Sequence, residues 1–241
     1  MTDIQTVTYR GFPIAIQHDD VPESPRAWDT LGTMVCSHRR YTLGDVQVAD
    51  GAIGFLEHLD DEHGIIANRA HSTLTEADAA VIKNWMQKQL IVCPLYLYSH
   101  GGIIMNTTGF SCPWDSGQVG WIYVTRERVR SEYGVARISK QLERVVQDRL
   151  RAEVAVYNDY LTGDVYGFNI PAINTPDSSC WGFYGHDHET SGLLDMARET
   201  IDGHIANVTR SHVAQRKAQI KKRAPLERRE ALAERLSAHR P

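Results

Sequence analysis

The sequence predicts an α+β fold in which a single mixed or mainly antiparallel sheet packs against a long amphipathic helix at about residues 138–161. Three observations carry this prediction. Short segments of alternating polarity occur in pairs joined by turns, which is typical of antiparallel strands. Apolar residues recur with helical spacing between residues 138 and 161. Residues 209–241 are polar and basic, which predicts a helical tail.

The N-terminal elements begin with two short strands within residues 6–17, on either side of a Gly-Phe-Pro turn at Gly11. Residues 19–29 contain two prolines and are predicted to form a loop, and residues 33–36 an inner strand. Residues 44–72 mix acidic residues, glycines and short apolar runs, and they give no clear assignment. Thr75 stands three residues before Asp78, the spacing of a capping box, and opens a helix to about Leu90.

The middle of the chain is predicted to form strands at residues 91–98, 103–105 and 119–124. Thr125 caps a short helix that ends near Gly134. Eight apolar residues give the helix at 138–161 its buried face: Ile138, Leu142, Val145, Val146, Leu150, Val154, Tyr157 and Leu161. Gly163 follows that helix as a C-terminal stop. Segments 164–170 and 179–184 alternate like the arms of a hairpin, and Thr190 or Ser191 caps a further helix to about Val208.

The charge divides the chain into a globular domain at 1–208, with a net charge of −11, and a tail at 209–241, with a net charge of +7. Pro225 is expected to interrupt the tail. The acidic body would repel DNA, so the tail is expected to serve homo-oligomerisation or docking on an acidic partner rather than nucleic-acid binding.

No apolar run approaches the roughly 20 residues of a membrane span, and no secretory signal precedes the body, so a cytoplasmic protein is expected.

The four cysteines, Cys36, Cys93, Cys112 and Cys180, are far apart and form no Cys-x-x-Cys pair. Each has apolar or aromatic neighbours, which favours buried free thiols over zinc ligands or a redox pair.

Candidate ligand-binding residues fall into two groups. Arg39 and Arg40 follow an apolar strand and His38, and an arginine fork binds phosphate or carboxylate. The other group contains aromatic residues and a carboxylate in loops or at strand ends, which suit stacking or partner anchoring: Trp28, Trp114, Asp115 and Trp181.

Catalytic and metal signatures are weak. Asp115-Ser116-Gly117 lacks the flanking glycines of a nucleophile elbow and is predicted to form a tight turn, with Gly117 at positive φ. The acidic and histidine clusters at 18–20, 58–63 and 186–189 are more typical of solvated turns than of ligands, so no metal and no cofactor are expected. If the chain is an enzyme, Asp115, His100 and His38 are the acid/base candidates.

Segments 22–41, 111–124 and 160–167 together resemble a family of uncharacterised proteins encoded by bacteriophages and related mobile elements. The likeness covers roughly residues 5–200. It implies a phage setting and carries no activity with it.

Two functional classes follow. We expect a non-catalytic accessory protein that binds a host protein or a small phosphorylated ligand in the host cytosol, with counter-defence as the analogy that the phage setting suggests. The alternative is a hydrolase of a phosphate-containing substrate.

Overall fold

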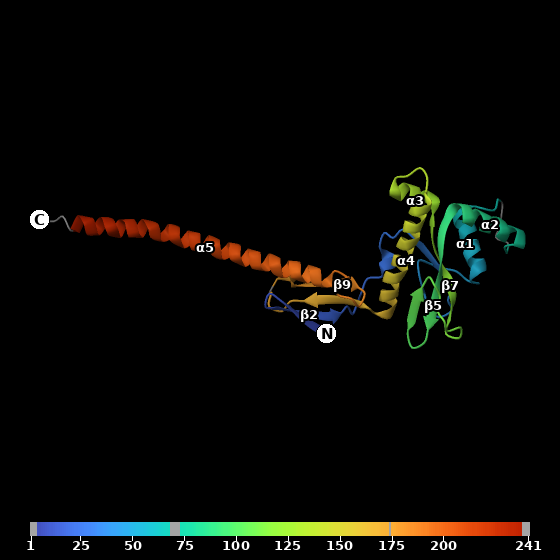
Figure 1. Ribbon diagram of the computed structural model, residues 1–241, viewed down its shortest axis with the longest axis horizontal. Coiled ribbons are helices and arrows are strands. Elements are labelled where there is room, and N and C mark those ends of the chain that lie inside the picture. Colours follow the sequence, from blue (N-terminus) through green and yellow to red (C-terminus); the bar gives the residue numbers. More distant parts are fainter. Residues whose placement is uncertain (1–3, 68–72, 174, 238–241) are drawn as a thin grey trace. The chain divides into compact units, whose positions relative to one another are not determined.

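A computed structural model describes residues 4–67, 73–173 and 175–237 (Figure 1). The fold is α+β, as predicted. The chain forms two compact units. The terminal unit contains Met1–His18, Tyr166–Phe183 and Asp187–Pro241, and the central unit contains Asp19–Val165 and Tyr184–His186.

The central unit is built on a five-stranded sheet with the strand order β4-β3-β7-β5-β6. β3 and β4 are parallel, and the other neighbouring strands are antiparallel. The strands are β3 (Thr33–Cys36), β4 (Val46–Gln47), β5 (Leu90–Ser99), β6 (Ile103–Asn106) and β7 (Ser116–Thr125). β5 and β7 pair along almost their whole length, with one irregularity at Leu95/Tyr96. These two strands form the middle of the sheet.

Helices cover both faces of this sheet. α4 (Lys140–Thr162) packs on one face, while α1 (Ala52–His63) and α2 (Glu76–Gln89) lie on the other (Figure 1). The alternation of side chains along β7 explains the division, because successive residues of a strand point to opposite faces. Ile122 and Val124 join the core under α4, and Tyr123 joins the core under α1 and α2.

Three helix ends confirm their capping predictions, whereas the cap predicted at Thr190 or Ser191 is wrong, because α5 (Leu193–Ser237) begins after Gly192. Thr75 and Asp78 form the full capping box of α2. Thr125 caps α3 (Arg126–Tyr133), and α4 ends at Gly163 in the left-handed conformation. Each of these positions was predicted because its residue type satisfies a backbone group that the helix end leaves unpaired.

Helix α1 and strand β4 lie in the region that gave no assignment. The residue before α1 is Gly51, at a φ of +56°, and no side chain caps the helix. The sequence therefore carries no start signal there, and the helix is held by burial of Phe55, Leu56 and Leu59 instead.

The terminal unit has its own four-stranded sheet, so the strands form two sheets and not the single sheet expected. Its order is β1-β2-β8-β9, with β1 (Gln5–Tyr9), β2 (Phe12–His18), β8 (Val165–Asn169) and β9 (Ser179–Tyr184). The first turn of α5 (Leu193–Ser237) and the turns that follow it close this core through Leu193, Ala197 and Ile201. Sequence periodicity identifies strands but not their partners, and so it could not separate the two sheets.

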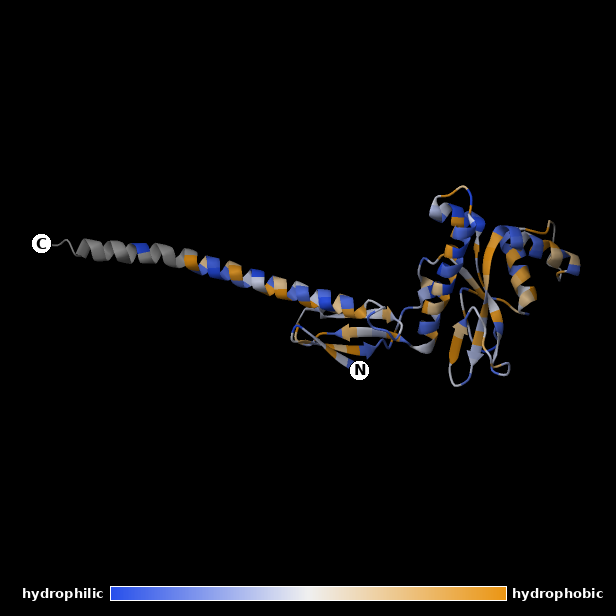
Figure 2. Cartoon of the chain, in the orientation of Figure 1, coloured by the Kyte–Doolittle hydropathy of each residue, from blue (hydrophilic) through white to orange (hydrophobic). Residues whose placement is uncertain are grey.

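Helix α5 runs through both Val208, where a helix end was expected, and Pro225, where an interruption was expected. A proline removes one helical hydrogen bond but need not end a helix whose neighbours favour helix formation. What changes is burial: Ile201 is buried, Ile205 is half-buried, and residues 206–220 are all exposed. Figure 2 shows that this stretch is mainly hydrophilic with isolated apolar residues. Within the described residues, no helix has the length and apolar character that a membrane crossing requires.

The cysteines match the prediction of buried thiols only in part. Cys36 and Cys93 are buried, whereas Cys112 and Cys180 are half-buried, and all four are free. Burial raises the pKa of the Cys36 thiol to about 12, which makes it inert as a nucleophile at neutral pH.

A buried arginine joins the segments around β3. The Arg26 side chain is only 6% exposed, and it donates from Nε and Nη2 to the two carboxylate oxygens of Asp45 at 2.9 and 2.6 Å. Its Nη2 also donates to the Gly32 carbonyl at 2.7 Å, and its Nη1 lies 3.5 Å from Glu153 Oε2. Glu153 in turn accepts the Leu31 and Gly32 amides at 2.8 and 3.0 Å. We call Arg26, Asp45 and Glu153 the Arg26 network.

Arg26→Ala should lower the free energy of unfolding by about 3–5 kcal/mol, because it leaves Asp45 and Glu153 without their buried cation. Urea unfolding monitored by circular dichroism measures this change. Arg144→Ala, at an exposed position on α4, is the matched control and should change stability by less than about 0.5 kcal/mol. Equal stabilities of the two variants would contradict a structural role for the network.

Gly120→Ala should destabilise the protein by about 1–3 kcal/mol or more, because an added Cβ would lie 2.1 Å from the Val35 carbonyl oxygen in the neighbouring strand. Gly117→Ala in the same strand is the control, since its added Cβ would meet no atom within 4 Å. Thermal melts of the two variants provide the comparison. A loss in Gly117→Ala as large as in Gly120→Ala would refute the close-approach argument.

Candidate anion-binding site

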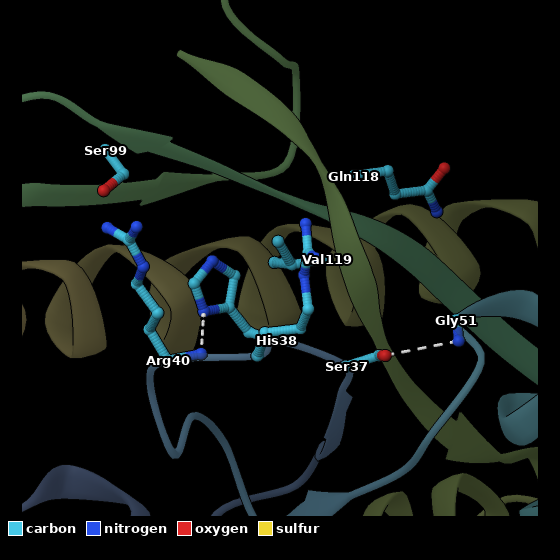
Figure 3. A pocket seen from close by; sticks show the side chains of 8 residues that line it. Ser37, His38, Arg40, Gly51, Ser99, Gln118 and Val119 are labelled. Atoms are coloured by element: carbon cyan, nitrogen blue, oxygen red, sulfur yellow. Dashed lines mark hydrogen bonds between the residues drawn. The ribbon is translucent and has the colours of Figure 1, made fainter.

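A pocket of about 700 Å³ opens at one end of the central sheet (Figure 3). The segment after β3 supplies Ser37, His38, Arg39 and Arg40, and Ser99 comes from the end of β5. The remaining lining residues are Gly51, before α1, and Gln118 and Val119 of β7. The volume is within the range of small-molecule sites, about 300–1,000 Å³.

The backbone fixes the segment after β3 in place. The Ser37 amide donates to the Val119 carbonyl at 2.7 Å, which extends the β3–β7 pairing by one residue. The Gly51 amide donates to Ser37 Oγ at 3.2 Å, a bond drawn in Figure 3. Because Ser37 Oγ accepts this bond, its hydroxyl proton is left to donate to a ligand.

The His38 ring is oriented by its own loop. Its Nδ1 accepts the backbone amide of Arg40 at 3.2 Å, a bond drawn in Figure 3, and the backbone amide of Tyr41, also at 3.2 Å. The ring also stacks on Tyr41 with centroids 4.9 Å apart. A nitrogen that accepts hydrogen bonds carries no proton, so the neutral ring holds its proton on Nε2 and can donate it. Burial lowers the pKa of His38, and the charges of Arg40 and Arg39 lower it further.

The two arginines are available for a ligand. Both are exposed, and among the described residues neither has a carboxylate within ion-pair distance. No Asp or Glu is among the residues that line the pocket. The pocket therefore presents guanidinium, hydroxyl and imidazole donors without a competing anion, and these groups suit a ligand with several anionic oxygens.

The other candidate residues do not line this pocket. Trp28 is 42% exposed, donates from Nε1 to Glu23 at 3.2 Å, and contacts Tyr184 edge-on. It lines a separate apolar cavity of about 190 Å³ beside α4. Trp114 is 92% exposed. Trp181 belongs to the terminal unit, where its ring lies over Gly167.

Asp115 and His100 do meet, as an acid/base pair requires. His100 Nδ1 lies 3.3 Å from Asp115 Oδ2, and Cys112 Sγ lies 3.8 Å from the same oxygen. The His100 and Asp115 side chains are 72% and 38% exposed, and neither lines the pocket. The turn predicted at 115–117 is not present as such, because β7 begins at Ser116 and Gly117 is not at positive φ.

Two histidines of the predicted clusters make structural contacts in the terminal unit. His18 and His188 both pack against the Tyr166 ring, at centroid distances of 4.8 Å. Within the part of the chain that the structure describes, no group of three or more His, Cys, Asp or Glu side chains is arranged to hold a metal ion.

Sequence reasoning missed Ser37, Ser99 and Gln118. Arg39 and Arg40 are adjacent in the sequence and carry charge, whereas Ser99 and Gln118 reach the pocket only through the register of β5 and β7. The end of a predicted strand was the one signal that could have singled out Ser99.

Comparison with known proteins found no match to this chain among protein-family models, curated proteins or solved structures.

In the free protein, the His38 imidazole should titrate below its usual pKa of about 6.5. A lowered pKa in the folded state means that the unfolded chain takes up the proton first. The contribution of His38 to stability is therefore present above pH 6.5 or so and is lost as the pH falls toward the folded pKa. NMR titration of the His38 ring measures this value, and Arg40→Ala should raise it. A pKa at or above that of an unstructured histidine would contradict the burial that causes the shift.

Proposed function

We propose that this chain is a non-catalytic binding protein whose Arg39–Arg40 pocket holds a small phosphorylated ligand. The observation that carries the proposal is the juxtaposition of Arg39, Arg40 and His38 in a cavity without a carboxylate. Both arginines are exposed, and neither forms an ion pair with a described carboxylate, so their guanidinium groups are available to an anion from solution.

The type of anion follows from the donors. Guanidinium groups bind two oxygens of a phosphate at once, and the Ser37 and Ser99 hydroxyls with His38 Nε2 add single donors from other directions. A planar carboxylate offers two oxygens, while a phosphate group offers three around a tetrahedral centre. Several donors, from the segment after β3 and from the end of β5, therefore favour a phosphate over a carboxylate.

Binding is favoured over catalysis because the acid/base pair and the donors do not coincide. His100 and Asp115 are outside the set of residues that line the pocket. Hydrolysis requires a general base within hydrogen-bond reach of the attacking water, next to the bound phosphate. His38, the third acid/base candidate, does line the pocket, but its Nδ1 accepts two backbone amides and its Nε2 carries the proton, so the neutral ring can donate a proton but not accept one. The hydrolase alternative therefore rests on the 3.3 Å His100–Asp115 contact.

On the sequence resemblance alone, we further propose a phage setting, with action in the cytosol of the host cell. Binding of the basic tail to a second copy of the chain, or to an acidic protein, stays a prediction. The exposure of residues 206–220 is compatible with either.

Wild-type protein should bind inorganic pyrophosphate, and Arg39→Ala and Arg40→Ala should each weaken that binding by about tenfold or more, since each removes charge-assisted hydrogen bonds. Isothermal titration calorimetry at low salt is the measurement, because screening weakens exposed charge pairs. Arg137→Ala, an exposed arginine elsewhere on the central unit, is the control and should bind as wild type.

Pyrophosphate binding that is absent, or equal in all four proteins, would overturn the proposed function. Release of inorganic phosphate during the titration, abolished by Asp115→Asn, would support the hydrolase alternative in its place.

A further inference from the structure

A second cavity of the central unit has the opposite charge character. It measures about 300 Å³ and is lined by residues of α1, α2, α3 and β7, with Glu62, His63, Trp85, Tyr123 and Glu127 among them. We call it the Glu62 cavity. We propose that it binds a small aliphatic amine.

The carboxylate of Glu62 is held in a fixed orientation at this cavity. The Tyr123 hydroxyl donates to Glu62 Oε2 at 2.5 Å, and His58 Nε2 lies 3.2 Å from both the Tyr123 oxygen and Glu62 Oε2. Tyr123 is only 2% exposed, and the Glu62 side chain is 45% exposed. A buried tyrosine therefore positions a carboxylate that itself reaches solvent.

The arrangement leaves acceptors for a donor ligand. Every contact that Glu62 makes with described residues uses Oε2, so Oε1 is left to accept a hydrogen bond. His63 Nε2 is buried, lies 3.8 Å from Glu62 Oε2, and makes no hydrogen bond with any described residue. An ammonium group has three N–H donors and no acceptor, which complements Glu62 Oε1, and also His63 Nε2 in the tautomer that carries its proton on Nδ1.

The charges at the cavity favour a cation. Glu62 and Glu127 both line it, and neither forms an ion pair with a described lysine or arginine. Arg128 also lines it but donates to the Thr30 carbonyl at 2.7 Å and pairs with Asp29. Burial lowers the pKa of His58, so this neighbour does not supply a positive charge at neutral pH.

The cation that fits is organic rather than metallic. Among the described residues, these side chains do not form a three-ligand metal group. Trp85 contributes an indole ring, tilted against His63 with centroids 4.8 Å apart, and aromatic rings attract ammonium groups. The volume is at the low end for ligand sites, which limits the amine to a few carbon atoms.

Putrescine is the probe that tests the site. Calorimetric titration or ligand-observed NMR should detect its binding to wild type, while the uncharged diol of the same chain length should not bind. Glu127→Gln should weaken putrescine binding by about tenfold, because the amide carries no charge to pair with the ammonium group. Glu127 is exposed and without an ion pair among the described residues, so this variant should fold normally. Glu132→Gln on the same helix, where Glu132 pairs with Arg149, is the control and should bind putrescine as wild type does.

Glu62→Gln should also weaken putrescine binding. No putrescine binding, equal binding of the diol, or unchanged affinity in both Glu62→Gln and Glu127→Gln would overturn the assignment. Zinc binding that depends on Glu62, without putrescine binding, would overturn it in favour of a metal. Arg39→Ala should bind putrescine normally, so the outcome is independent of the proposed anion site.

Discussion

The buried guanidinium of Arg26 links segments of the central unit that are far apart in the sequence. It contacts Asp45 beyond β3, the Gly32 carbonyl before β3, and Glu153 on α4. A charge that is almost fully buried is tolerated only when it is paired with opposite charge and hydrogen-bonded, so loss of one partner disturbs the others. Asp45 also accepts the Met34 amide at 2.7 Å, which ties the network to the first residues of β3. The network therefore fixes β3 to α4 on one face of the sheet and to the residue before the edge strand β4.

The candidate anion site is a consequence of where β3 ends. Two residues without side chains, Gly32 and Gly120, let β3 approach α4 and β7 closely: an added Cβ would lie 2.6 Å from Leu150 at Gly32, and 2.1 Å from the Val35 carbonyl at Gly120. The strand then continues into Ser37, and Arg39 and Arg40 reach the pocket from the segment after it. The segment 22–41 thus combines a structural part around Arg26 with a part at its end that lines the pocket.

Local chemistry explains which features the sequence predicted and which it did not. Thr75 with Asp78, and Gly163, mark helix ends because their effect acts within a few residues. α1 was missed because Gly51 gives no capping signal. Arg39 and Arg40 were predicted because charge and adjacency are visible in the sequence, whereas Ser99 and Gln118 depend on strand register with an irregularity at Leu95/Tyr96. The three tryptophans Trp28, Trp114 and Trp181 were grouped by residue type alone, and the fold distributes them to unrelated places.

Two cavities of the central unit differ in the charge of the side chains that line them, and the net charge of the chain does not reveal this difference. The body carries −11, and its long-range field attracts cations, yet the larger pocket is lined by arginine and histidine without a carboxylate. An anion therefore gains nothing from long-range steering, and its binding must come from donors in direct contact. The Glu62 cavity is the converse case, in which the field of the whole body and the local carboxylates act in the same direction. The side chains that face each cavity therefore set its local charge, and substitution of distant acidic residues should weaken binding of a cation and strengthen binding of an anion by similar, small amounts.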